Sequence, residues 1–332
     1  MGLSGAEQLR SLLSGETPPP PLSRLTGMRL EEYGAGTAAF RMPLSAWLGG
    51  PAGTISLGAL TIPADAAMAC AVMTTLPPAT PFTTSELSLR LLRPPAPGGS
   101  VLARARVIQA GPPVALADVE LRDDDGELVA HGSSLCITLG PLEPGSVPGE
   151  PARTTHADPA GDPDPWERPV SGVSPAPTGW ERLSGLQRLS ARLSSRQPAS
   201  PIELLTGLAP AAASAGQASF ALSASPWFAA PPPGRVQGGV VALLADAALS
   251  GAAETVTPAG TSFTAIDLKL NYLRPLASDG REVQAHARLI HSGRRIAVAG
   301  AEVQGADGRA FAFATGSGLF SPAPGAPDAV AR

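Results

Sequence analysis

The sequence repeats itself once along most of its length. Matching blocks keep their order, and their separation grows from 180 to 181 and then to 182 residues. The matched blocks are 21–27 with 201–207 at offset 180, 65–67 with 246–248 and 92–94 with 273–275 at offset 181, and 103–108 with 285–290 at offset 182. Loops tolerate single-residue insertions that packed elements do not. The drift therefore indicates a duplicated domain with short loop insertions.

Both copies show the same order of elements. A short strand, 36–42 or 217–223, precedes a long apolar helix, and four runs of alternating pattern follow it. In the second copy these runs are 262–273, 282–291, 295–304 and 309–318. Asp-Gly pairs at 125–126 and 307–308 predict a two-residue hairpin turn before the last run of each copy. We expect an α+β fold in which an antiparallel sheet covers a buried helix.

Composition sets the domain boundaries. Ten prolines lie in 140–179, with few large apolar residues, a pattern typical of a linker. Leucines spaced by three and four residues up to Leu193 predict an amphipathic helix at the start of the second copy. We predict domains at 1–139 and 180–320 and a disordered tail at 321–332.

Charge and cysteine content exclude several classes of function. The net charge is −4 and no basic run occurs, so neither nucleic acid nor a membrane surface is expected as a partner. Two cysteines are too few for a disulfide framework or a four-cysteine zinc site. No segment has the length of a signal peptide or a membrane span, so we expect a cytoplasmic protein without a bound metal.

Each predicted helix carries one carboxylate, Asp65 or Asp246, among apolar residues. Burial of a lone carboxylate costs several kcal/mol or raises its pKa, so such a group usually has a partner or a use. In the second copy the helix starts with Gly238 and Gly239. Exposed amide groups at a helix N-terminus can polarise a carbonyl oxygen, although paired glycines are also common in simple tight turns.

Residues 236–246 (Val-Gln-Gly-Gly-Val-Val-Ala-Leu-Leu-Ala-Asp) and 266–275 (Ile-Asp-Leu-Lys-Leu-Asn-Tyr-Leu-Arg-Pro) resemble the PaaI-type hotdog thioesterases. That family has a His-Gly-Gly helix start, an acidic residue on the helix and a strand that ends in Tyr-Leu-x-Pro. The resemblance implies two tandem hotdog domains, each a long helix wrapped by an antiparallel sheet, that form an intramolecular pseudo-dimer. The family's His is replaced by Gln237 here and by Ser56 in the first copy.

The resemblance also implies active sites shared between the two domains. Gly238 would face Asp65 and Thr84 in one site, and Leu57 would face Asp246 and Ala265 in the other. The family's hydroxyl falls on Thr84, so we favour the first site. Pro63 argues against it because a proline ahead of Asp65 should kink the helix. The Asp246 site, with Thr264 one residue from the hydroxyl position, therefore stays an alternative.

The implied activity is hydrolysis of an acyl-CoA or acyl-carrier-protein thioester, with CoA as part of the substrate and no separate cofactor. Gln237, Gly239, Arg274, Arg294 and Arg295 are the residues expected to contact the CoA portion. A non-catalytic acyl-thioester-binding or assembly protein is the main alternative. A hotdog dehydratase is disfavoured because none of the four histidines lies on a predicted helix. A homodimer of double-hotdog chains is possible.

Overall fold

The computed structural model describes residues 3–51, 53–139, 163–172, 179, 182–194, 199–231 and 234–322. Each half of the chain forms the same series of elements. The first comprises α1 (Gly5–Leu13), α2 (Pro21–Thr26), β1 (Arg29–Gly34), β2 (Thr37–Pro43), η1 (Ala46–Leu48), α3 (Leu57–Met73), β3 (Phe82–Leu91), β4 (Ser100–Gln109), β5 (Val114–Asp123) and β6 (Leu128–Thr138). The second comprises α4 (Gly185–Leu193), α5 (Pro201–Thr206), β7 (Ala209–Ser214), β8 (Gln217–Ser223), η4 (Pro226–Phe228), α6 (Gly238–Glu254), β9 (Thr261–Tyr272), β10 (Glu282–Ser292), β11 (Ile296–Gly305) and β12 (Ala310–Pro322).

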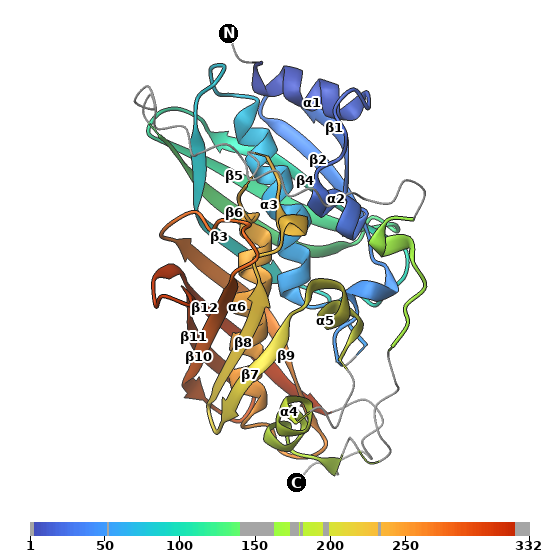
Figure 1. The fold of residues 1–332 in the computed structure, drawn as a ribbon, viewed down its shortest axis with the longest axis vertical. Helices are drawn as coiled ribbons and strands as arrows, with labels where there is room; N and C mark the ends of the chain where they lie inside the picture. Colours follow the sequence, from blue (N-terminus) through green and yellow to red (C-terminus); the bar gives the residue numbers. More distant parts are fainter. Residues whose placement is uncertain are drawn as a thin grey trace.

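The strands form one antiparallel sheet of twelve, in the order β1-β2-β4-β5-β6-β3-β9-β12-β11-β10-β8-β7. The two halves join where β3 pairs with β9, with Leu87 opposite Leu270 and Leu89 opposite Leu268. Figure 1 shows the sheet curving around α3 and α6, which run through the centre of the molecule. This arrangement of two hotdog repeats in one chain confirms the predicted fold class.

Helices α3 and α6 are the core of the two repeats. Each has 17 residues and is apolar on all sides, and 13 of the 17 residues in each are buried. A helix with no polar stripe gains stability only when every face packs against another element. The sheet covers the outer faces of the two helices, and each helix covers an inner face of the other. The only acidic residues within their buried stretches are Asp65 and Asp246.

The duplication extends further toward the N-terminus than the matched blocks show. Helices α1 and α4 both begin with a serine that caps the helix and a glycine that is buried. A Cβ on Gly5 would lie 2.2 Å from the carbonyl oxygen of Met73, and one on Gly185 would lie 1.8 Å from that of Glu254. Each glycine therefore lets the first helix of its repeat lie against the C-terminus of the central helix. The predicted amphipathic helix of the second repeat is α4, and its counterpart α1 was not predicted.

The edge strands β1 and β7 were not predicted either, whereas β8 has its predicted bounds and β9 to β12 differ from theirs by one to four residues. The segment 163–172, part of the predicted linker, contacts the first repeat. Arg24 forms an ion pair with Asp164 (2.8 Å), and the Trp47 indole donates to the carbonyl of Arg168 (2.6 Å). Residues 140–162 and 173–178 of the linker and 323–332 of the tail lie outside the described residues, while 321 and 322 belong to β12.

The two repeats also exchange short contacts near the centre. The amide of Leu22 in α2 donates to Ala229 of the second repeat (3.4 Å), and the amide of Ile202 in α5 donates to Gly49 of the first (3.2 Å). Among the described helices, none is both long and apolar enough to cross a membrane.

Candidate active site

The two predicted carboxylates lie at the N-termini of the opposite helices. The amide of Gly239 in α6 donates to Asp65 Oδ2 (3.3 Å), and the amide of Gly58 in α3 donates to Asp246 Oδ2 (3.0 Å). These pairs are equivalent at the offset of 181 residues. Helices α3 and α6 are therefore antiparallel and overlap over their first turns, and each carboxylate caps the start of the other helix.

The glycines at these helix starts are required by the close approach of the two helices. A Cβ on Gly239 would lie 2.6 Å from the carbonyl oxygen of Thr61 and 2.7 Å from Cα of Ile62. A Cβ on Gly58 would lie 2.9 Å from Cα of Leu243. Both glycines lie inside helices, so a tight turn with positive φ is not the reason for them. They allow a carboxylate on one helix to reach the amide groups of the other.

The structure brings Asp65, Thr84 and the start of α6 together, as predicted for the favoured site. Asp65 is 5% exposed, and its Oδ1 accepts a hydrogen bond from the Thr84 hydroxyl (3.3 Å). Burial raises the pKa of Asp65 to about 6, against the opposing effects of the Gly239 amide, Thr84 and the Gly238 amide. The Gly239 amide makes the main-chain hydrogen bond to this carboxylate, and a Cβ on Gly238 would lie 3.1 Å from Asp65 Oδ2, so Gly238 also lies against it.

Thr84 lies at an irregularity of β3 that both repeats share. The pairing of β3 with β6 shifts between Thr84 and Glu86, and the pairing of β9 with β12 shifts next to Ala265. The bulge re-aims the preceding side chain toward the helix. Because Ala265 occupies the equivalent place, the second repeat presents a methyl group where the first presents a hydroxyl.

The site around Asp246 has a different set of neighbours. Asp246 is 3% exposed, and burial raises its pKa to about 6, against the opposing effects of the Gly58 amide and the Ser56 side chain. Within the described residues, Thr264 is not among the groups that hydrogen-bond to Asp246; it lies on β9 opposite Leu319. The amide that donates to Asp246 is that of Gly58, the residue after Leu57.

Pro63 does not displace Asp65. Helix α3 continues from Leu57 to Met73 with Pro63 inside it, and Asp65 keeps its contacts with Gly239 and Thr84. A proline within a helix removes one backbone hydrogen bond, that of the carbonyl four residues earlier. The carbonyl of Ile62, the residue directly before Pro63, accepts a hydrogen bond from Nε2 of Gln237 (2.9 Å). The argument from Pro63 against the Asp65 site therefore fails.

Tyr272 was not assigned a role in the Asp65 site from the sequence, whereas Gln237 was expected to contact the CoA portion of the substrate. The Tyr272 hydroxyl donates to the carbonyl of Gly238 (2.8 Å). The Oε1 atom of Gln237 is buried without a hydrogen-bond partner among the described residues, 2.8 Å from where a Cβ of Gly239 would lie. The motif contains both residues, but only the fold shows that Tyr272 and the start of α6 meet.

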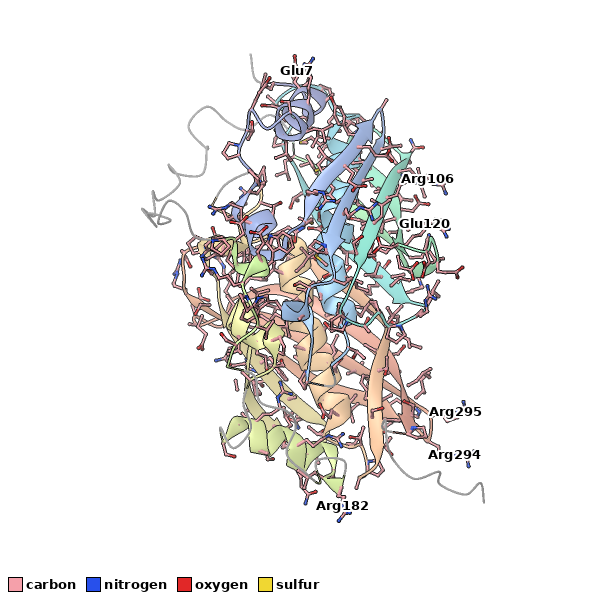
Figure 2. All side chains as sticks on the ribbon, turned by 90° about the vertical axis from the view of Figure 1, so that its right-hand side faces the viewer. Glu7, Arg106, Glu120, Arg182, Arg294 and Arg295 are labelled. Atoms are coloured by element: carbon pink, nitrogen blue, oxygen red, sulfur yellow. The ribbon has the colours of Figure 1, made fainter. Side chains whose placement is uncertain are left out.

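The three predicted arginines lie on the surface. Arg274 follows Tyr272 by two residues and donates to the carbonyl of Ala310. Arg294 and Arg295 occupy the turn between β10 and β11 and project outward from the second repeat (Figure 2). The structure therefore places Arg274 near the end of β9 that carries Tyr272 and does not bring the other two to Asp65. No group of metal-ligating side chains occurs in the part of the chain that the structure describes.

Comparison with known proteins agrees with this architecture. The thioesterase superfamily model matches residues 52–130 and 233–312. The fold is similar to acyl-CoA thioesterase II TesB2 from Mycobacterium marinum (12% identity, 94% of this chain, 99% of that chain, TM-score 0.56). It is also similar to the tesB protein of Mycobacterium avium subs paratuberculosis (15% identity, 94% and 100% covered, TM-score 0.56). A conserved hot dog protein of unknown function from Alicyclobacillus acidocaldarius gives 14% identity, 91% and 98% coverage and a TM-score of 0.55.

At these identities the solved structures show the fold alone, and no curated protein matches the sequence. The matches reach the superfamily, and the PaaI type within it stays a prediction from the motif. The chain is a double hotdog, and each of its two repeats contains a segment that matches the thioesterase superfamily.

Proposed function

We propose that the protein hydrolyses an acyl thioester at the site formed by Asp65, Thr84 and the start of α6. The observation that carries this proposal is a buried carboxylate that lies within hydrogen-bond reach of a hydroxyl group and of a helix N-terminus from the other repeat. These are a base, a group that can orient water and a set of amide donors, which acyl transfer to water requires.

The reaction follows from these positions. An amide at the start of α6, that of Gly238, polarises the thioester carbonyl oxygen, and the positive end of the helix dipole stabilises the negative charge that develops there. Asp65 takes a proton from a water molecule that Thr84 orients, and the water oxygen attacks the carbonyl carbon. The carbon–sulfur bond then breaks, and the proton passes to the leaving thiolate. Direct attack by Asp65, with hydrolysis of the resulting anhydride, uses the same groups.

The pKa of Asp65 suits a base at neutral pH. A carboxylate with a pKa of about 6 is mostly ionised at pH 7, yet it binds a proton more readily than an ordinary aspartate does. Asp246 shares this pKa but lacks a threonine at the bulge position. We assign Asp246 the role of a helix cap and assign turnover to the Asp65 site.

The motif supports a CoA or carrier-protein thioester as the substrate. Gln237 and Gly239, at the start of α6, and Arg274, beyond Tyr272, are the residues proposed to contact its pantetheine and phosphate groups. Arg294 and Arg295 could contact phosphate only from the outer end of the second repeat. Binding without turnover is the outcome that would favour the alternative of a non-catalytic acyl-thioester-binding protein.

A thiol-release assay tests the proposal. The purified chain is incubated with acyl-CoA thioesters of increasing chain length, with aryl-CoA thioesters and with acyl-carrier protein. We expect hydrolysis of at least one class, a loss of about 100-fold or more in Asp65→Asn and a change of less than about threefold in Asp246→Asn. Absence of thiol release from every substrate, or equal losses in the two variants, would contradict the assignment.

A further inference from the structure

One peptide unit at the start of α6 makes side-chain hydrogen bonds through both its carbonyl and its amide group. The carbonyl oxygen of Gly238 accepts a hydrogen bond from the Tyr272 hydroxyl (2.8 Å). The amide of Gly239, on the other side of the same peptide bond, donates to Asp65 Oδ2 (3.3 Å). Tyr272 and Asp65 are therefore connected through a single planar group.

This connection affects the amide as a donor. A hydrogen bond to the carbonyl oxygen of a peptide polarises the whole unit, so its N–H becomes a stronger donor. The bond also fixes the plane of the peptide, which the N-cap residue does not do, because Gln237 makes no side-chain cap and directs its amide to Ile62 instead. Tyr272 thus sets both the strength and the direction of an amide that faces Asp65.

The first repeat holds its helix start in another way. The residue equivalent to Tyr272 is Leu91, which has no hydroxyl group. There the Ser56 side chain caps α3 by accepting a hydrogen bond from the amide of Ala59 (3.2 Å). The tyrosine therefore distinguishes the site that has Thr84 from the site that has Ala265.

Tyr272 stays a donor over the working pH range. Burial, followed by the negative charges of Asp65 and Glu86, raises the pKa of Tyr272 well above its usual value. Burial, followed by the charge of Asp65, also raises the pKa of the two thiols, Cys70 to about 12 and Cys136 to about 11, so they are neutral near pH 7. Glu86, whose pKa burial raises, has Lys269 Nζ at 3.9 Å from its carboxylate.

We propose that Tyr272 is a positioning residue of the candidate active site, which orients and polarises the Gly238–Gly239 peptide so that the amides of α6 face Asp65 and the substrate carbonyl. The inference rests on the proposed function for its catalytic consequence. Its effect on Asp65, however, can be measured without any substrate.

Tyr272→Phe removes only the hydroxyl group, and Tyr33→Phe is the matched control because Tyr33 lies in β1. We expect kcat to fall roughly tenfold in Tyr272→Phe, with KM changed by less than about threefold, since one positioning hydrogen bond is lost. We also expect the pKa of Asp65, followed by NMR titration of the free protein labelled at aspartate, to rise. Weaker amide donors stabilise the carboxylate less, whereas a purely structural tyrosine would not move this pKa.

A second measurement covers the case in which Tyr272→Phe does not fold. The chain has only two tyrosines, so 3-fluorotyrosine incorporated into Tyr33→Phe labels Tyr272 alone. Its more acidic hydroxyl is a stronger donor, and the pKa of Asp65 should fall. An unchanged pKa of Asp65 in both proteins would overturn the inference. A shifted pKa without thiol release from any substrate would uphold the positioning role and contradict the proposed function.

Discussion

At the residue scale, the two aspartates are explained by where their carboxylates lie. Each is buried and each caps the opposite helix, so a purely structural reading accounts for both. The two aspartates differ in the groups that surround their carboxylates. Asp65 has the Thr84 hydroxyl and the Tyr272-bonded peptide, whereas Asp246 has Ser56, and the bulge position of its own repeat holds Ala265. A catalytic role is therefore argued for Asp65 alone.

The pH dependence of hydrolysis follows from the pKa of Asp65. The proposed base acts only when ionised, and the pKa of Asp65 in the protein without substrate is about 6. We expect kcat/KM to rise about tenfold per pH unit below pH 6 and to level off above it. A rate profile between pH 4.5 and 8.5 with a non-ionising acyl thioester checks this. A profile that stays flat through pH 6 would exclude Asp65 as the base.

The same pKa values predict an effect on stability. An aspartate with a pKa of about 6 in the folded protein and about 3.9 when unfolded binds more protons in the folded state between these values. Its contribution to stability is therefore fully present below about pH 4 and is lost as the pH rises through 6. At pH 8 we expect the free energy of unfolding of Asp246→Asn to be roughly 2–3 kcal/mol higher than that of the unmodified chain. Near pH 4 the two free energies of unfolding should be similar. Denaturant titrations at both pH values measure the difference, and a gain that is equal at the two would refute the argument.

At the scale of elements, the crossing of α3 and α6 depends on glycine. Gly239→Ala places a methyl group 2.6 Å from the carbonyl oxygen of Thr61 and 2.7 Å from Cα of Ile62. Alanine favours a helix over glycine by up to about 1 kcal/mol, but overpacking against a backbone costs about 1–3 kcal/mol. We expect a net loss of stability in Gly239→Ala, measured by denaturant unfolding, and little change in Ser250→Ala of the same helix. A stabilised Gly239→Ala would show that the helices can move apart.

The success of prediction also differed between elements for physical reasons. In β10 to β12 buried residues alternate with more exposed ones, and in β10 the sequence Glu-Val-Gln-Ala-His-Ala-Arg follows that alternation directly. The edge strand β7 reads Ala-Pro-Ala-Ala-Ala-Ser, which has neither alternation nor β-branched residues, so only its pairing with β8 defines it. The composite site was predicted through the motif and the duplication. The hydrogen bond from the Gly239 amide to Asp65 and the contact of Tyr272 with Gly238 depend on how α6 packs, which spacing does not encode.

At the scale of the whole molecule, the two repeats do not form separate bodies. They share one sheet through β3 and β9, each caps the central helix of the other, and α2 and α5 bond to backbone across the boundary. Neither half contains a complete Asp65 site, because Asp65 and Thr84 come from one repeat and Gly239 and Tyr272 from the other. A fused pair can therefore keep one site while the other diverges. In the Asp246 site, Ala265 stands at the position of Thr84 and Leu91 at the position of Tyr272.

This sharing predicts one cooperative unfolding transition. Leu87 lies at the β3–β9 junction with no exposed surface, and Leu87→Ala should lower the free energy of unfolding by about 2–4 kcal/mol. Because the junction joins the two halves of the one sheet, the slowest-exchanging amides of β5 and β11 should lose protection equally in hydrogen-exchange measurements. Leu92→Ala, at a site that is 60% exposed, is the control and should change neither strand. If β5 lost protection while β11 kept it, the repeats would unfold independently. The prediction of one cooperative transition would then be wrong, and the shared sheet would not stabilise the site that both repeats form.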